Sequence, residues 1–338
     1  MPDRSGVRAE GLVKIYRGGV TAVSDVSLVA AEGEVVGVLG PNGAGKSTTL
    51  RILTTLLRPT RGRATVDGFD IGDVKSVRPL LGVALQEVGL DPLMSGNEHF
   101  AVQAALYGVS PDQLRRVSTP LIERFVLGSY LDREVGAYSG GTQRKLALAL
   151  ALSPDPPVIV LDEPTAGLDP HSRRQVWELL EELRSRGKVV LFSTQYMDEA
   201  ERLCDRIYVI DRGRIVAHGS PDELRALVGE GALRVLADIP PDELRGLIAD
   251  LLPADGEGVE EDGEALVVKI PLDSALPVEI LTALQSGGAR VRELSLSPPT
   301  LEDTFIQLTG RALRPEPLGR SASDVGLSMH RGGGAQWR

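Results

Sequence analysis

One short glycine-rich segment constrains the fold more than any other feature of the chain. Residues 40–47 read Gly-Pro-Asn-Gly-Ala-Gly-Lys-Ser and satisfy the phosphate-loop pattern G-x-x-x-x-G-K-[ST] in full. An apolar, valine-rich run at 35–39 precedes the segment and predicts a buried strand, and the residues after Lys46 favour a helix. Strand, loop and helix in this order bring backbone N–H groups and the positive end of the helix together on an anion. The sequence therefore predicts a nucleoside triphosphate site in an α/β protein.

The positions of this loop have distinct predicted tasks. We expect Lys46 to reach the β- and γ-phosphates and the hydroxyl of Ser47 to bind Mg²⁺. The glycines let backbone N–H groups approach the phosphate oxygens closely. The residues expected to contact ATP in this segment are Gly40, Pro41, Asn42, Gly43, Ala44, Gly45, Lys46, Ser47 and Thr48.

Further apolar runs predict a mostly parallel sheet. They lie at residues 158–161, 189–192 and 206–210, and helical stretches alternate with them. Ligands of such sheets bind at the carboxyl ends of the strands. The first run ends in Asp162 and Glu163, which can hold Mg²⁺ and polarise an attacking water. An exposed turn is the commoner explanation for two acids at a strand end. Asp162 and Glu163 therefore indicate a catalytic site only together with the motifs around them.

The composition and the pattern of predicted strands and helices change along the 338 residues of the chain. We predict an ATP-binding domain over residues 7–228, with a helical subdomain at about 95–155. Alternating strand and helix patterns then predict a small α+β domain over 229–310. Residues 311–338 are rich in Gly, Pro, Ser and Arg and predict a disordered tail.

Bulk composition excludes several classes of function. The net charge of −10 and the aromatic content of 4% argue against a protein that coats nucleic acid, so no nucleic-acid partner is expected. No run approaches the ~18 apolar residues that span a membrane. If the protein serves transport, another chain must form the membrane path. The single cysteine cannot form an intrachain disulfide and fits a reducing compartment.

Motifs on both sides of the acid pair resemble the ATP-binding cassette (ABC) family. Residues 138–142 read Tyr-Ser-Gly-Gly-Thr where the family signature is Leu-Ser-Gly-Gly-Gln, and Gly-Leu-Asp follows at 167–169. The resemblance covers about residues 7–225, and six elements occur in the family's order. It implies an ABC-type nucleotide-binding domain with a mostly parallel sheet core, an antiparallel β subdomain and a helical subdomain, which binds ATP and Mg²⁺.

The resemblance also implies roles for residues outside the phosphate loop. Tyr16 would stack on adenine, although a plain strand tyrosine is the alternative. Gln86 would bind Mg²⁺ and water and sense the membrane partner. Asp162 would be a ligand of Mg²⁺, and Glu163 would be the general base.

The family site implied by this resemblance is shared between two chains. Ser139, Gly140 and Gly141 would bind the γ-phosphate held by the opposite subunit, and Asp169 would couple the two half-sites. The implied assembly is a homodimer in the ATP-bound state.

Two positions depart from the family pattern. Gln195 stands where the family usually has His, and Thr142 stands where it has Gln. The amide of Gln195 can still donate a hydrogen bond to the γ-phosphate, but it carries neither a proton nor a positive charge. We therefore expect hydrolysis to survive at a reduced rate. Position 142 is peripheral to the phosphate, so its effect should be mild.

Gln195 narrows the resemblance to bacterial drug-resistance ATPases of the daunorubicin and doxorubicin exporter type. Residues 301–310 also resemble the C-terminal end of those proteins. This implies an ATPase that drives drug efflux from the inner, cytoplasmic face of the membrane by pairing with a separate transmembrane subunit. A soluble ABC ATPase that acts on ribosomes or DNA is one alternative, and a nucleotide sensor without hydrolysis is another.

Overall fold

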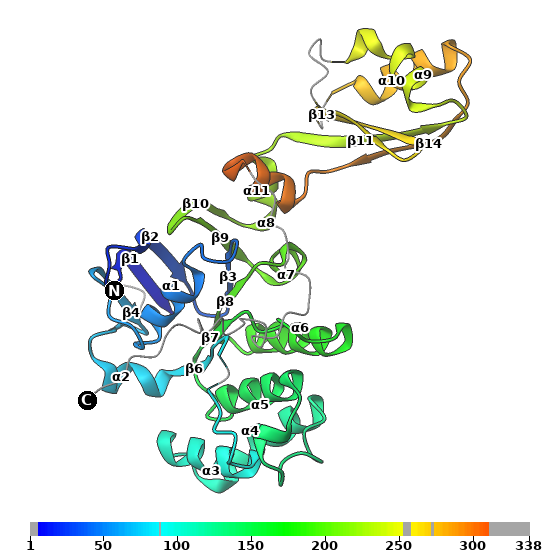
Figure 1. Ribbon diagram of the computed structural model, residues 1–338. Coiled ribbons are helices and arrows are strands. Elements are labelled where there is room, and N and C mark those ends of the chain that lie inside the picture. The colour runs from blue at the N-terminus through cyan, green and yellow to red at the C-terminus, as the bar shows by residue number, and fades with distance from the viewer. Residues whose placement is uncertain (1–5, 88, 253–257, 272–273, 311–338) are drawn as a thin grey trace, which may run out of the picture.

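The residues that the structure describes form three β-sheets (Figure 1). The computed structural model describes residues 6–87, 89–252, 258–271 and 274–310. The tail at 311–338, which the sequence predicts to be disordered, lies outside the described residues. Two of the sheets belong to the N-terminal two thirds of the chain, and the third lies beyond residue 229.

The central sheet has six strands in the order β10-β9-β3-β8-β7-β6. Their bounds are β3 (Val35–Leu39), β6 (Leu81–Ala84), β7 (Val158–Asp162), β8 (Val189–Thr194), β9 (Arg206–Asp211) and β10 (Arg214–Gly219). All neighbours pair in parallel except β9 and β10, which are antiparallel. The three buried strands predicted after residue 150 are confirmed. The carboxyl ends of β3, β7 and β8 meet at one edge, as a parallel sheet requires.

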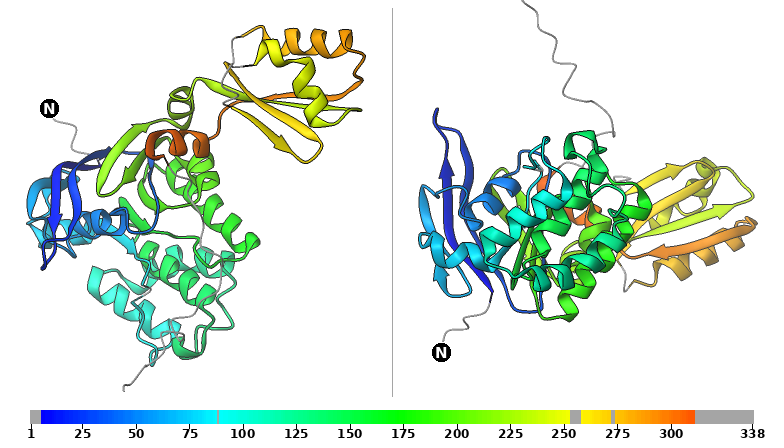
Figure 2. Two further views of the ribbon diagram at one scale, coloured as in Figure 1. Left: turned by 45° about the horizontal axis from the view of Figure 1, so that its top comes forward. Right: turned by 90° about the horizontal axis from the view of Figure 1, so that it is seen from below.

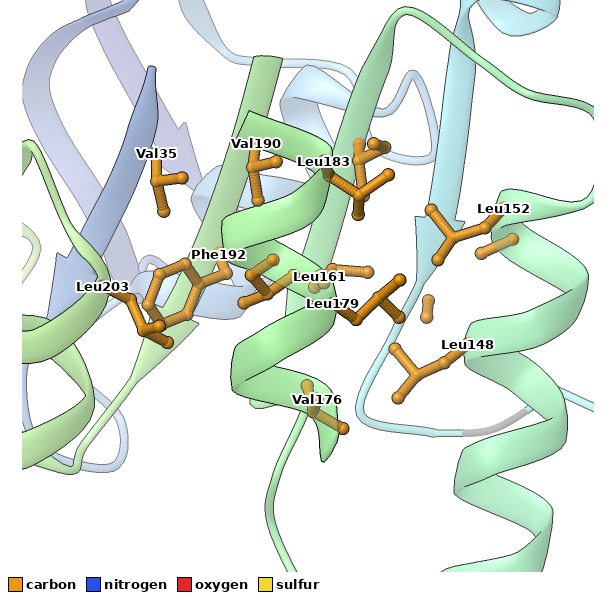
Figure 3. Close-up of a cluster of buried hydrophobic side chains, with 14 of the residues drawn as sticks. Val35, Leu148, Leu152, Leu161, Val176, Leu179, Leu183, Val190, Phe192 and Leu203 are labelled. Atoms are coloured by element: carbon orange, nitrogen blue, oxygen red, sulfur yellow. The ribbon is translucent and has the colours of Figure 1, made fainter. Parts of the chain in front are cut away.

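Both faces of the central sheet are covered, which is why its strands read as continuous apolar runs. In β3, Val36 and Val38 face one layer, and Val35 and Leu39 face the other. Helix α1 (Lys46–Leu53) and the antiparallel sheet cover the first face. The second face is covered by α5 (Gly140–Leu152), α6 (Pro170–Ser185) and α7 (Met197–Leu203). Figure 3 shows this layer, with Leu148, Leu152, Leu179 and Leu183 packed near Leu161, Val190 and Phe192.

The second sheet forms the antiparallel β subdomain that the family resemblance predicts. Its order is β2-β1-β4-β5. The strands are β1 (Val7–Ile15), β2 (Thr21–Ala30), β4 (Arg61–Val66) and β5 (Phe69–Asp70). The short helices α2 (Val74–Val77) and η1 (Arg78–Leu80) lead from it into β6.

A helical region follows β6, as the sequence predicts. It contains α3 (Gly96–Tyr107), α4 (Pro111–Arg124), the 3-10 turn η2 (Val135–Ala137) and α5. Ser95, Ser110 and Ser139 cap the three α-helices through hydrogen bonds to backbone N–H groups. Figures 1 and 2 show these helices gathered at the end of the molecule opposite the C-terminal sheet.

The C-terminal sheet has the order β12-β13-β11-β14 and a core of its own. Its strands are β11 (Glu230–Ala237), β12 (Val259–Asp262), β13 (Ala265–Pro271) and β14 (Val291–Ser297), packed with α9 (Pro241–Leu247), η3 (Ala249–Leu251) and α10 (Leu276–Ser286). The acidic sequence of β12 gave no strand signal. It forms an edge strand because its exposed side chains need no burial there.

Helix α11 (Leu301–Thr309) follows this sheet in the chain and packs on α8 (Pro221–Ala226) (Figures 1 and 2). Leu301 and Phe305 join the core cluster of the central sheet. The hydroxyl of Thr304 donates to the carbonyl of Leu224 at 3.2 Å. Helix α8 begins at a capping box formed by Ser220 and Glu223. No helix in the described ranges has the length and apolar character needed to cross a bilayer.

Candidate active site

The phosphate loop connects β3 to α1, and its glycines are required by the geometry. Gly45 has φ of 107°, and a Cβ there would lie 2.5 Å from the carbonyl oxygen of Ala22. A Cβ on Gly40 would lie 2.2 Å from the carbonyl oxygen of Ile210. Both contacts are impossible for any other residue. Strand, loop and helix occur in the predicted order, so backbone N–H groups at the start of α1 can receive an anion.

Lys46 is buried and points back over the loop. Its Nζ donates to the carbonyls of Gly40 at 2.7 Å and Pro41 at 3.2 Å. The same nitrogen lies 3.3 Å from Glu163 Oε1. Burial lowers the pKa of Lys46, and the neighbouring carboxylate of Glu163 opposes that decrease. The loop lysine and the predicted general base are therefore direct neighbours.

Asp162 ends β7 beside the first turn of α1. Its Oδ1 accepts hydrogen bonds from Ser47 Oγ at 3.1 Å and from the hydroxyl of Ser193. Its Oδ2 is buried and accepts no hydrogen bond from any residue that the structure describes. A buried polar oxygen without a hydrogen-bond partner is costly. This orientation gives a cation next to Ser47 a carboxylate ligand.

Glu163 has an unusual backbone conformation, and hydrogen bonds hold both its N–H and its carbonyl group. Its φ of 50° lies in the left-handed region, which costs a non-glycine residue about 1–2 kcal/mol. Its N–H donates to the carbonyl oxygen and the hydroxyl of Ser193, both at 3.1 Å. Arg144 donates to its carbonyl. The side chain is thereby directed toward Lys46 and Gln86, and the Gln86 amide donates to it at 3.4 Å.

Tyr16 lies at the open side of the loop. Its side chain is 38% exposed, and its hydroxyl is 3.3 Å from the hydroxyl of Thr48 in α1. Lys14 Nζ lies 5.6 Å from the centre of the same ring. The ring is thus accessible beside the helix that follows the phosphate loop.

The signature segment starts α5, away from the phosphate loop. Ser139 caps this helix, and its oxygen accepts from Thr142 N–H at 3.2 Å. The hydroxyl of Thr142 lies 2.8 Å from the same oxygen. Among the described residues, no hydrogen bond joins Ser139, Gly140 or Gly141 to the phosphate loop. These three residues are exposed or half-buried.

Asp169 and Gln195 flank the acid pair on different segments. Asp169 caps α6, and hydrogen bonds from Ser172 lower the pKa of its carboxyl to about 2. Gln195 follows β8 and is half-buried. Its amide makes no hydrogen bond to any other residue in the described part of the chain. Thr194, the residue before it, accepts a hydrogen bond from Gly40 N–H at 3.3 Å.

Arg144 and Ser193 are site residues that sequence reasoning missed. Arg144 is 4% exposed and donates to the backbone carbonyls of Leu85, Gln86, Asp162 and Glu163. Burial lowers its pKa. It lies on the apolar face of α5, four residues before Leu148. A charged residue on a predicted buried helix face is the sequence feature that could have identified it. Ser193 pairs in register with Asp162, which only the strand order reveals.

Two protein-family models match parts of this chain. Residues 23–166 match the family model described as "ABC transporter". Residues 219–309 match the model described as "ATP-binding protein DrrA1-3-like, C-terminal domain".

Characterised relatives cover nearly the whole chain. The daunorubicin resistance ATP-binding protein DrrA2 of Streptomyces coeruleorubidus is 40% identical, over 91% of this chain and 96% of that protein. The doxorubicin resistance ATP-binding protein DrrA of Mycobacterium tuberculosis (strain ATCC 25618 / H37Rv) is 35% identical, over 91% and 94%. The Nod factor export ATP-binding protein I of Burkholderia orbicola (strain AU 1054) is 39% identical, over 86% and 93%.

Solved structures match about two thirds of the chain. An ATP-binding subunit of an ABC transporter superposes with a TM-score of 0.63 at 30% identity, covering 67% of this chain and 94% of that chain. A dimeric ATP-binding cassette in a post-hydrolysis state, bound to ADP and Pi, superposes with a TM-score of 0.59 at 28% identity, covering 63% and 98%.

A phosphate loop, an acid pair at the end of β7 and a signature segment on a helical subdomain define a P-loop ATPase. The chain belongs to the ABC transporter family, in the group of exporter ATP-binding subunits that includes the DrrA drug-resistance proteins. It is an ATP-hydrolysing subunit of an exporter. The relatives do not support the alternative of a soluble ATPase for ribosomes or DNA.

Proposed function

We propose that this chain powers the efflux of a drug-like compound by closing as a homodimer on ATP and Mg²⁺ at the inner face of the membrane. The observation that carries the proposal is the convergence of Lys46, Ser47, Asp162 and Glu163 at one edge of the central sheet. In this assignment Lys46 binds the β- and γ-phosphates, and Glu163 is the general base. Tyr16 stacks on adenine, and Gln195 donates to the γ-phosphate.

The Mg²⁺ part of the proposal is supported by the donor set. Asp162 Oδ2 is buried without a hydrogen-bond partner among the described residues, and Ser47 Oγ lies beside the other oxygen of that carboxylate. Hydroxyl, carboxylate and amide oxygens suit this hard cation. Ser47, Asp162 and Gln86 would hold it, and it would supply charge neutralisation between the β- and γ-phosphates.

The dimer part is supported by the placement of the signature segment. Ser139 and Gly140 are exposed at the start of α5, where the first backbone N–H groups of a helix have no intrahelical partner. No hydrogen bond joins them to the phosphate loop within the described residues, so a second copy can use them on its own γ-phosphate. Asp169 lies between the two half-sites in this arrangement. One related cassette was solved as a dimer bound to ADP and Pi.

The transport part draws on relatives named for daunorubicin resistance, doxorubicin resistance and Nod factor export. We infer a separate transmembrane permease, contacted near Gln86 and the helical subdomain at about 95–155. We further infer that residues 7–228 form the ATPase domain and that 229–310 form an accessory domain. In this division α11 ties the accessory domain to α8.

The central test is the variant Glu163→Gln. A general base contributes about 10²–10⁴-fold in rate. We expect turnover to fall by about that factor, while ATP together with Mg²⁺ holds the variant as a stable dimer on size-exclusion chromatography. Glu181→Gln is the matched control, because Glu181 is a surface acid paired with Arg202. If Glu163→Gln hydrolyses ATP at the wild-type rate, the proposed mechanism is wrong.

The efflux assignment has its own test. We expect a gene for a protein with about six apolar segments of ~20 residues beside the gene for this chain. Expression of both proteins should raise the daunorubicin concentration that a sensitive bacterium tolerates, and the Glu163→Gln form should remove that gain. A gain that persists with Glu163→Gln contradicts ATP-driven efflux by this subunit.

A further inference from the structure

A buried carboxylate lies behind the site and takes no part in the steps above. Glu199, in α7, is 1% exposed, and both of its oxygens accept hydrogen bonds. Oε2 accepts from the hydroxyl of Thr194 at 2.8 Å. Oε1 accepts from the hydroxyl of Thr165 and from Trp177 Nε1 at 3.3 Å. The two oxygens of a carboxyl group offer several lone pairs, so Glu199 can accept from all three donors at once.

Thr194 transmits this contact to the backbone around Gln195. Its hydroxyl gives its one hydrogen to Glu199, so its lone pairs are free to accept, and they accept from Tyr196 N–H at 2.9 Å. The carbonyl of Thr194 accepts from Gly40 N–H at 3.3 Å. Gln195 therefore stands between two residues whose backbone is fixed, and one of them also contacts the phosphate loop.

Thr165 transmits the second contact to the segment of the acid pair. It is 1% exposed and lies two residues after Glu163. Its carbonyl accepts from Leu168 N–H at 3.1 Å, and Asp169 follows directly. Trp177, the third donor, lies in α6, the helix that Asp169 caps.

Arg173 lies between the buried carboxyl group of Glu199 and the ring of Tyr196. Its Nε lies 4.0 Å from Glu199 Oε1, and its guanidinium lies 4.7 Å from the centre of the Tyr196 ring. Burial raises the pKa of Glu199, and the hydrogen bonds from Thr165, Thr194 and Trp177 oppose that rise. The Arg173 guanidinium thus contacts the Tyr196 ring, next to Gln195, and also lies near Glu199, which holds Thr194 on the other side of Gln195.

We propose that Glu199 is a positioning residue for ATP hydrolysis. It fixes the segment that carries Gln195 relative to the segment that carries Glu163 and Asp169, and it acts on turnover through the position of Gln195. This inference rests on the proposed function, because it uses the roles assigned there to Gln195 and Glu163.

The test compares Glu199→Gln in two backgrounds of the full-length protein. Glutamine keeps the volume, but its amide donates where Thr194 also needs an acceptor. We expect kcat at saturating ATP and Mg²⁺ to fall about tenfold, the value of one hydrogen bond to a charged group. We expect Kd for ATP to change by less than about twofold, because no phosphate contact is lost. In the Gln195→Ala background the same change should cost less than about twofold, because the residue that Glu199 positions is absent.

A second pair of variants keeps the test valid if Glu199→Gln does not fold. Thr194→Val keeps the shape and removes the hydroxyl, and we expect the same loss of kcat as for Glu199→Gln. Thr194→Ser keeps the hydroxyl and should restore most of the turnover. Glu34→Gln is the control for the loss of a hydrogen-bonded, half-buried acid, since Glu34 pairs with Arg206 at the far end of β3. It should lower the melting temperature without lowering kcat.

The outcomes separate this inference from the proposed function. An equal loss for Glu199→Gln in both backgrounds would mean that the residue acts on folding or on another group, and it overturns the inference alone. So does an unchanged kcat for Glu199→Gln when Gln195→Ala is slow. An unchanged rate for Gln195→Ala removes the proposed role of Gln195, and this inference with it. The activity of Glu163→Gln then decides the rest of the proposed function.

Discussion

Lys46 Nζ lies 3.3 Å from Glu163 Oε1, and the two side chains are only 4% and 7% exposed. The phosphate-binding cation and the general base of the proposed mechanism thus neutralise each other inside the protein. A γ-phosphate that binds Lys46 competes with Glu163 for the same ammonium group. Binding of ATP is therefore coupled to the environment of the base.

The first prediction concerns Lys46→Met. This change removes the charge-assisted contacts to the phosphates and leaves Glu163 buried without its nearest cation. Because hydrogen bonds to charged groups are worth about 1.5–3 kcal/mol, we expect ATP affinity to fall about 10–100-fold. Titration calorimetry with ATP and Mg²⁺ measures it. Lys188→Met is the control, since Lys188 pairs with Asp155 outside the site. Unchanged affinity in Lys46→Met would contradict the assignment.

The second prediction concerns Arg144, which holds four backbone carbonyls around the site. Arg144→Met leaves these buried acceptors without a donor, and we expect the free energy of unfolding to fall by about 2–4 kcal/mol. Arg144→Lys should lie between this variant and the wild type, because one ammonium cannot reach all four oxygens. Urea unfolding measures both.

The control for Arg144 is Arg63→Lys, because Arg63 forms an exposed pair with Glu10. It should change stability by less than about 1 kcal/mol. Equal stability of Arg144→Met and the wild type would show that water replaces the guanidinium at no cost.

The third prediction concerns Gln195. We expect Gln195→Ala to lower turnover about tenfold, since it removes a donor to the γ-phosphate. Gln195→His should restore the donor and add a titration near pH ~6.5, where imidazole changes charge and an amide does not. The measurement is kcat as a function of pH for all three proteins. A wild-type profile with the same inflection as Gln195→His would rule out this explanation.

The fourth prediction concerns the pH dependence of stability at Asp169. Hydrogen bonds from Ser172 lower the pKa of this carboxyl from 3.8 to about 2. Because the pKa in the folded state is the lower one, the stabilisation is fully present above about pH 4 and is lost as the pH falls toward 2. Asp169→Asn keeps the capping oxygen but loses the charge. Its melting temperature should therefore depend less on pH in this window than that of the wild type.

The comparison for this prediction is made on thermal unfolding curves between pH 2 and 5. Asp112→Asn serves as control, because Asp112 is an exposed acid in the first turn of α4. If Asp169→Asn and the wild type lose stability in parallel on acidification, Ser172 does not stabilise the ionised form.

The sequence alone determined the elements whose cause is local. The glycine-rich pattern at residues 40–47 marks the phosphate loop, Ser220 and Ser139 start helices by capping, and the apolar runs of β7 and β8 are typical of buried strands. The signature segment and the acid pair were readable for the same reason. Each of these features is written within about ten consecutive residues.

Only the tertiary structure decided which of these pieces touch. Arg144 reaches carbonyls 18 to 59 residues away, and Glu199 joins Thr165 to Thr194 across 34 and 5 residues. Strand order places Ser193 beside Asp162, and packing places α11 on α8 instead of on its own sheet. Such contacts depend on the order and register of the strands and on how helices pack on the sheet. A local sequence pattern encodes neither. The chemistry of the site was therefore legible in the sequence, whereas the hydrogen bonds that hold it in place were not.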